Sequence, residues 1–248
     1  MRIIISPAKK MNINTDDLGY RDLPEFLPQT ETILEKLQEM NYDELKSLWK
    51  CSDKIAEENY ARIRNMDLRR VLTPAVLAYE GIQYQYMAPA VFSGEEYDYI
   101  QEHLRILSGF YGVLKPFDGV VPYRLEMQAK LAISDTKDLY DFWGASLADK
   151  LAAETDCILN LASKEYSISI LKHLPKDFRF ITCVFGEEVN GKIVEKGTLC
   201  KMARGEMVRR MAEQRIENPE EIKTLQLLDY EYSEEHSDEK LYVFLKKE

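Results

Sequence analysis

The chain has 248 residues, enough to bury a full hydrophobic core in one large domain or two small ones. Hydrophobic residues make up 45% and charged residues 31% of the sequence, and no apolar run approaches the roughly 20 residues that span a bilayer. The formal net charge of −10 excludes a generally basic nucleic-acid coat protein, although it leaves room for a local basic cleft.

The first residues hold only three consecutive isoleucines before Ser6 and Pro7, too few for a secretory signal, so we expect a cytoplasmic protein. The three histidines and four cysteines have no metal-ligand spacing, and reduced, mostly buried thiols are expected. Walker A, dinucleotide-binding and nucleophile-elbow motifs are missing from the sequence. We therefore predict neither a bound metal nor a cofactor.

The first third of the chain predicts one buried strand followed by helices. Residues 2–6 read as the strand, and the polar, proline-containing residues 12–28 read as a loop. A helix is predicted over residues 30–40 from its apolar face. Asn41 with Glu44 forms a capping-box pattern for the next helix, and another helix starts at Ser52.

The middle of the chain mixes strand and helix signals. Residues 75–87 are rich in β-formers around a glycine and predict a strand and turn. Ser93 with Glu96 is a second capping box, opening a helix that should end at Gly109 as its first residue past the C-terminus. A further helix is predicted over residues 138–154, and a strand over residues 157–163.

The last quarter predicts a hairpin, a helix and two strands. Asn190-Gly191 between alternating residues indicates a two-residue hairpin, and residues 198–216 have helical periodicity. The final two apolar runs are expected to pair antiparallel across an acidic loop. Strands and helices mix without strict alternation, which favours an α+β fold: one domain over residues 1–248 with a mixed β-sheet wrapped by helices.

Two loops could bind an anion. Lys9 and Lys10 follow the first buried strand, where open sheets place ligand groups, although a solvated loop also explains them. Gly109 and Gly112 flank a tight turn whose backbone N–H groups could meet phosphate oxygens. The glycines lie one residue farther apart than in a helix–hairpin–helix turn, and a simple helix cap is the alternative.

Charged and polar side chains in three other segments could share that site. Arg124 and Glu126 fall on one face of an extended stretch, where they either pair with each other or line a cleft, with Arg124 gripping an anion. Lys164 and Tyr166 follow the strand at residues 157–163. Lys201 and Arg204 share a helix face next to Gly205, whose cost in a helix suggests a close approach of another backbone or a ligand; a solvated basic helix is the alternative.

In combination, these segments resemble the YaaA family of bacterial peroxide stress proteins. The resemblance covers nearly the whole chain and is carried, in order, by ISPAKKM, SDKIAEENYAR, HLRILSGFYGVLKPFD, PYRLEM, DLYDFWG, ILNLASKEYS and the KMARG helix. It implies a single-domain α+β fold, a cytosolic role in the response to hydrogen peroxide, and lowering of free intracellular iron. It also implies DNA binding through a positively charged cleft with a helix–hairpin–helix-like element, best matched here by residues 103–116.

Two functional hypotheses follow. In the first, a basic cleft contacts DNA phosphates with little sequence preference. Its candidate residues are Lys9, Lys10, Arg105, Gly109, Gly112, Arg124, Lys164, Tyr166, Lys201 and Arg204. In the second, the same cleft is the active site for a small anionic substrate, with Glu126 or Lys164 as acid or base. A deep pocket too tight for a duplex would favour the second hypothesis. Direct iron binding is a weaker third option.

Overall fold

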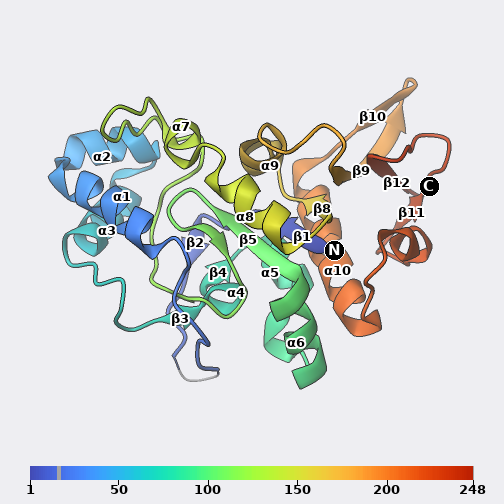
Figure 1. Ribbon diagram of the computed structural model, residues 1–248, viewed down its shortest axis with the longest axis horizontal. Coiled ribbons are helices and arrows are strands. Elements are labelled where there is room, and N and C mark those ends of the chain that lie inside the picture. The colour runs from blue at the N-terminus through green and yellow to red at the C-terminus, as the bar shows by residue number, and fades with distance from the viewer. Residues whose placement is uncertain (16–17, 248) are drawn as a thin grey trace.

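A computed structural model describes residues 1–15 and 18–247, which form one α+β domain around a mixed eight-stranded sheet (Figure 1). The helices are α1 (Leu27–Glu39), α2 (Tyr42–Trp49), α3 (Asp53–Arg64), α4 (Ala75–Ala78), α5 (Ile82–Met87), α6 (Gly94–His103), α7 (Leu139–Trp143), α8 (Ser146–Glu154), α9 (Lys164–Leu171) and α10 (Gly197–Gln214), with 3-10 turns at Pro89–Val91 and Pro219–Thr224. The strands are β1 (Arg2–Ile5), β2 (Lys10–Met11), β3 (Thr73–Pro74), β4 (Tyr79–Glu80), β5 (Leu104–Ser108), β6 (Gly112–Leu114), β7 (Gly119–Val120), β8 (Cys157–Leu161), β9 (Arg179–Val189), β10 (Lys192–Val194), β11 (Tyr230–Tyr232) and β12 (Leu241–Lys246).

The sheet is mixed, as predicted; two antiparallel pairs lie at its edges, β11 with β12 and β5 with β6, and a third joins β10 to the far end of β9. The order is β11-β12-β9-β8-β1-β5-β6, with β10 added to β9, and the five central strands from β12 to β5 run parallel. All five residues of β5 and of β8 are buried, as expected for strands covered on both faces. In Figure 1 the helices α1–α3 gather at one end of the molecule and β11 and β12 at the other.

The order in which the parallel strands are added to the sheet reverses at β1. After β1 the chain builds β5 on one side of it, then crosses to build β8, β9 and β12 in succession on the other side. Numbered along the chain, the five strands therefore lie in the order 2-1-3-4-5. In open sheets of this kind, ligands bind where the order reverses, at the carboxyl ends of the strands. The loops after β1 and β8 are the expected place for a site.

Helix starts follow the capping signals read from the sequence. The Asn41 side chain accepts the Glu44 N–H at 3.0 Å, and the Glu44 carboxylate accepts the Asn41 N–H at 2.8 Å. The second capping box, Ser93 with Glu96, forms in the same way at α6. The helices predicted from Ser52 and over residues 30–40 are also confirmed, the latter beginning three residues earlier at Leu27.

Residues 75–87 are not a strand and turn, as the sequence suggested, but two short helices joined by a strand of two residues. Ala75, Val76 and Ala78 of α4 are buried, and α5 packs against α10. Aromatic residues favour strands only weakly, and packing against another helix overrides that preference here. Ala88 then ends α5 in the left-handed conformation with φ 50°.

The helix expected to reach Gly109 ends at His103. Residues 104–108 instead form β5, which pairs parallel with β1, and Gly112 begins β6 with φ 75° after a tight turn. The expected helix–hairpin–helix-like element at residues 103–116 is thus a helix followed by a β-hairpin. A fully buried strand is a continuous apolar run, which periodicity alone does not separate from the buried face of a helix.

The other expected elements are confirmed with one break. The helix predicted over residues 138–154 is divided at Gly144 (φ 49°) into α7 and α8. Asn190 and Gly191 both have positive φ, 52° and 73°, and join β9 to β10 as a two-residue hairpin. The helix α10 and the antiparallel pair β11 and β12 lie where the sequence placed them.

Candidate functional site

A cavity of about 420 Å³ lies at the carboxyl ends of β1 and β8, the point where the strand order reverses. The loops after the two strands are joined directly, because the Ser163 N–H donates to Ser6 Oγ at 2.8 Å. Tyr84 of α5 donates its hydroxyl to the Ser6 carbonyl at 3.0 Å, which attaches α5 to the same loop. The site is therefore built on rigid sheet termini.

Seven of the residues proposed from the sequence line this cavity. They are Lys9, Lys10, Arg124, Glu126, Tyr166, Lys201 and Arg204. The segments that supply them are far apart in the chain, and the fold brings them to one cavity. The same wall includes the carboxylates of Glu80 and Glu165 and the amide of Gln83.

The cavity carries an excess of positive charge in a chain whose net charge is −10. Five cationic side chains and three carboxylates line it. Lys9 Nζ lies 2.9 Å from a Glu126 carboxylate oxygen, and Arg124 Nη2 lies 3.8 Å from the same oxygen, so Arg124 and Glu126 do share a face. Lys10 pairs with Glu80, and Arg204 Nη2 lies 3.3 Å from Glu195 at the edge of the site.

Three buried donors on the cavity wall have no acceptor in the described part of the chain: Gln83 Nε2, Arg124 Nε and Arg204 Nε. The Arg124 and Arg204 side chains are only 13% and 14% exposed, and Gln83 is 7% exposed. A buried donor without an acceptor costs about 1–3 kcal/mol, more when the group is charged. A ligand rich in acceptor oxygens would recover this cost.

Helix α10 approaches α5 closely because position 205 is glycine. A Cβ built on Gly205 would lie 2.1 Å from the Gln83 carbonyl oxygen and 2.9 Å from the Met87 nitrogen. The glycine therefore serves a close backbone approach, one of the two reasons considered from the sequence. The approach places Lys201 and Arg204 of α10 and Gln83 of α5 on one wall.

A hydroxyl network beneath the segment of Arg124 and Glu126 supports it. Tyr123 shares hydrogen bonds with the Tyr79 hydroxyl at 2.9 Å and with Ser108 Oγ at 2.6 Å. Ser108 Oγ in turn accepts the N–H groups of Phe110 and Tyr111. Burial raises the pKa of Tyr123 to about 12, so its phenol stays protonated at neutral pH.

Gly109 and Gly112 are buried and do not line the cavity. A Cβ on Gly109 would lie 2.9 Å from the Met127 backbone nitrogen, and the Gly109 carbonyl accepts the Trp143 indole N–H at 3.0 Å. Gly112 takes φ 75° against the Trp143 ring. The structure gives both glycines a packing role beneath residues 124–127 rather than a place on the cavity wall.

Lys164 is exposed and is not part of the cavity wall, whereas its neighbour Glu165 is. Lys164 is the first residue of α9, so successive side chains point in different directions around the helix. Glu165 Oε1 accepts the Gln128 N–H at 3.3 Å. Burial raises the pKa of Glu165 above its usual value, and the nearby Glu126 carboxylate adds to the rise.

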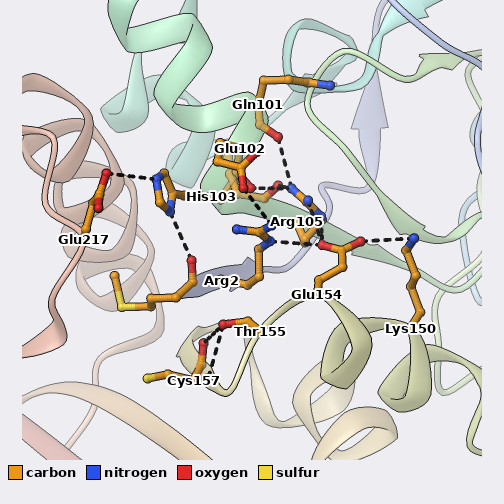
Figure 2. A network of polar contacts seen from close by, with 12 residues as sticks. Arg2, Gln101, Glu102, His103, Arg105, Lys150, Glu154, Thr155, Cys157 and Glu217 are labelled. Atoms are coloured by element: carbon orange, nitrogen blue, oxygen red, sulfur yellow. Dashed lines mark hydrogen bonds and ion pairs between the residues drawn. The ribbon is translucent and has the colours of Figure 1, made fainter.

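Arg105 is also absent from the cavity wall. Figure 2 shows it in a polar network with Arg2, Glu154 and Lys150. It is 3% exposed, and its Nε and Nη2 atoms lie 2.8 and 2.7 Å from a Glu154 carboxylate oxygen. Its Nη1 donates to three carbonyls at the junction of α6 and β5. All three guanidinium nitrogens have acceptors in the protein, so Arg105 is a structural cation here.

Arg105 lines a separate cavity of about 220 Å³ together with the buried carboxyl group of Asp118. Burial raises the pKa of Asp118 to about 7, against the opposing effects of the Lys115 N–H and of the Lys115 and Arg105 charges. Unfolded aspartate loses its proton near pH 4. Between about pH 4 and pH 7 the folded state therefore holds the extra proton, and its stability falls as the pH rises.

The variant Asp118→Asn should remove this pH dependence. Asparagine does not ionise, and its amide oxygen can still accept the Lys115 N–H, which Asp118 accepts at 2.8 Å. We expect the variant to match the parent near pH 4 and to exceed it in unfolding free energy at pH 8. Urea unfolding of both proteins at pH 4, 6 and 8 measures the difference, and a constant difference across these values would contradict the assignment.

A family model described as peroxide stress protein YaaA matches residues 1–236. This chain belongs to the YaaA family. The chain is 56% identical over 248 residues to a UPF0246 protein of Lachnoclostridium phytofermentans, covering all of this chain and 97% of that protein. It is 54% identical to a UPF0246 protein of Agathobacter rectalis and 50% identical to one of Pediococcus pentosaceus, each covering all of this chain and 99% of the relative.

Three buried thiols of this YaaA-family chain are poorly suited to reaction with peroxide. Cys157, Cys183 and Cys200 are buried, and all four cysteines are free. Burial raises the pKa of Cys200 to about 11 and raises the pKa values of Cys157 and Cys183 as well. Because the thiolate is the reactive form, these three residues are mainly packing groups.

Within residues 1–15 and 18–247, no group of three or more His, Cys, Asp or Glu side chains could hold a metal ion. In the same described residues, no helix has the length and apolar character needed to cross a membrane.

Glu80, Gln83 and Glu165 are site residues that the sequence did not single out. Gln83 and Glu80 lie in the segment read as a strand and turn. Glu80 is on the strand β4, whereas Gln83 is brought to the cavity by the helix α5, which the sequence did not indicate. Glu165 was overlooked beside Lys164. Reading residues 164–171 as a helix would have separated the two residues. On a helix that begins at Lys164, the side chains of Lys164 and Glu165 point about 100° apart, so only one of them can face the cavity.

Proposed function

We propose that this peroxide stress protein binds a small phosphate-bearing ligand in the cavity at the ends of β1 and β8. The observation that carries the proposal is the set of three buried donors without acceptors, on Gln83, Arg124 and Arg204, around a cavity with excess positive charge. Phosphate supplies several acceptor oxygens with negative charge, and arginine matches its geometry. The size of the cavity favours a small ligand over a duplex inside it.

The carboxylates of the cavity supply an acid–base pair for a bound substrate. Glu165 has a raised pKa through burial, whereas Glu126 is held between Lys9 and Arg124. Two carboxyl groups in unlike environments are the usual basis for assigning a general acid and a general base. Glu165 is then the candidate general acid, and Glu126, which contacts Lys9 and Arg124, is the candidate general base. This assignment replaces Lys164 by Glu165 and keeps Glu126.

The test is calorimetric titration of the protein with inorganic phosphate and pyrophosphate. Each of Arg124→Ala and Arg204→Ala should weaken binding about tenfold or more, because a hydrogen bond to a charged group contributes about 1.5–3 kcal/mol. The matched control is Arg70→Ala, since Arg70 is an exposed arginine paired with Asp67 and lies outside the cavity wall. Absence of binding by the parent, or equal affinity in all variants, would overturn the proposal.

Contact with a DNA backbone is the second candidate, because exposed lysines surround the opening. Lys9, Lys10 and Lys201 line the cavity and are exposed, so a nucleic acid lying across the mouth would meet them first. Such binding should weaken steeply between low and moderate salt, and the triple lysine-to-alanine variant should reduce the salt dependence. An affinity for duplex DNA that is unchanged by salt would remove this candidate.

A further inference from the structure

A second cavity of about 990 Å³ adjoins the first. Lys9, Arg124 and Glu126 line both, so the two cavities lie on either side of this charged trio. The remaining wall of the second cavity comes mainly from α2, the residue Lys50 that follows it, residues 128–130 and α7. Its members are Met40, Asp43, Glu44, Ser47, Leu48, Trp49, Lys50, Gln128, Ala129, Lys130 and Tyr140. We call it the Trp49 cavity.

The Trp49 cavity differs from the first in charge. Apart from the shared trio, its charged residues are two carboxylates, Asp43 and Glu44, and two lysines, Lys50 and Lys130. These charges balance, whereas the first cavity has an excess of cations. Its apolar members include an indole, a phenol ring and the side chains of Met40 and Leu48. The two cavities together suit a ligand with an anionic head and an uncharged, partly apolar body.

Trp49 supplies an unused hydrogen-bond donor in this wall. Its side chain is 4% exposed, and its Nε1 has no acceptor among the residues that the structure describes. The other tryptophan, Trp143, donates its Nε1 to the Gly109 carbonyl at 3.0 Å, which is the usual state of a buried indole. An unpartnered buried donor of this kind is rare in folded proteins and calls for an explanation.

We propose that the two cavities together bind one nucleotide, with its phosphate in the first cavity and its base in the Trp49 cavity. A nucleobase has an aromatic face to pack against the partly exposed Tyr140 and ring acceptors for the Trp49 indole N–H. The charge-balanced wall suits the neutral base, and Arg124 at the junction faces the phosphate. The inference rests on the proposed phosphate site and adds the class of the ligand. The nucleotide is either free or one unit of a single strand, and the chemistry of recognition is the same for both.

The experiment compares the affinity of the full chain for phosphate alone, for a nucleoside without phosphate, and for whole nucleotides. Tryptophan fluorescence and calorimetry are followed with inorganic phosphate, adenosine, the four nucleoside 5′-monophosphates and a four-nucleotide DNA strand. At least one monophosphate should bind about tenfold or more tightly than phosphate, because base stacking on an aromatic side chain adds that much. If only the four-nucleotide strand binds more tightly than phosphate, the site takes a nucleotide within a single strand.

The variant Trp49→Phe isolates the indole donor. Phenylalanine keeps an aromatic ring and removes the unpartnered N–H, which offsets part of the cost of its smaller volume, so the free protein should stay folded with a urea midpoint close to that of the parent. Its affinity for the best nucleotide should fall several-fold, with phosphate affinity unchanged. Arg204→Ala should weaken both.

The two proposals fail in different ways. If phosphate binds and no nucleotide or strand binds more tightly, the Trp49 cavity is not a base site, and the phosphate site stands. If neither phosphate nor any nucleotide binds, the phosphate site is overturned and the inference with it. Equal nucleotide affinity in Trp49→Phe and the parent would remove the indole from the recognition of the base.

Discussion

Replacing Glu154 by glutamine is expected to lower the free energy of unfolding by about 3 kcal/mol or more. The Glu154 carboxylate is the common partner of Arg2, Arg105 and Lys150, at distances of 3.1, 2.7 and 3.2 Å (Figure 2). Arg105 is the most buried of the three, and glutamine would leave its charge without a counter-ion. Removal of one partner from a buried ion pair is strongly destabilising for that reason.

Urea unfolding measures this loss, with Glu39→Gln as the matched control. Glu39 pairs with Lys36 on an exposed helix surface, where an ion pair contributes little. Burial acts to raise the pKa of Glu154, but Arg105, Arg2 and Lys150 together hold it below its usual value. The stability from Glu154 is therefore present above the unfolded pKa near 4 and is lost as the pH falls through the lower folded value. A Glu154→Gln protein as stable as Glu39→Gln at pH 7 would contradict the role of the network.

The sequence predicted the fold through its local signals. Both capping boxes, at Asn41 and Ser93, form as read, because they depend only on residues three apart. The Asn190-Gly191 hairpin forms for the same reason, since its two residues supply the positive φ values that the turn requires. Elements whose identity depends on distant partners were read less well. The strand β5 exists because β1 pairs beside it, and no local pattern reports that pairing.

The sequence predicted which segments supply the candidate site, and the structure corrected which of their residues line it. Lys9, Arg124 and Arg204 meet in one cavity because the fold brings the loop after β1, the segment of residues 123–126 and α10 to the same wall. Arg105 belongs to the same quoted segment as the turn at Gly109, but its place on a buried strand directs it to Glu154. The sequence therefore identified segments that supply the site. Which side chains of a segment face the cavity depends on the sheet, and the sequence did not show that.

Gly205→Ala is expected to lower the free energy of unfolding by about 3 kcal/mol. The new Cβ would lie 2.1 Å from the Gln83 carbonyl oxygen, which belongs to the backbone of α5 and has no flexible end to move aside. The helices α5 and α10 must separate, and overpacking of this kind costs about 1–3 kcal/mol or more. The higher helix propensity of alanine returns less than about 1 kcal/mol of that loss.

Gly197→Ala in the same helix is the matched control, because no atom lies within 4 Å of a Cβ at that position. It should leave the unfolding free energy unchanged or slightly raised. The two variants should also differ in phosphate affinity, since separation of α5 from α10 moves Gln83 away from Lys201 and Arg204. Equal stability with equal phosphate affinity would show that α10 can shift without cost to the site. If the Gly205→Ala protein is still folded and binds phosphate more weakly than Gly197→Ala, the glycine sets the binding geometry. That result is expected, because Gln83, Lys201 and Arg204 line the same cavity.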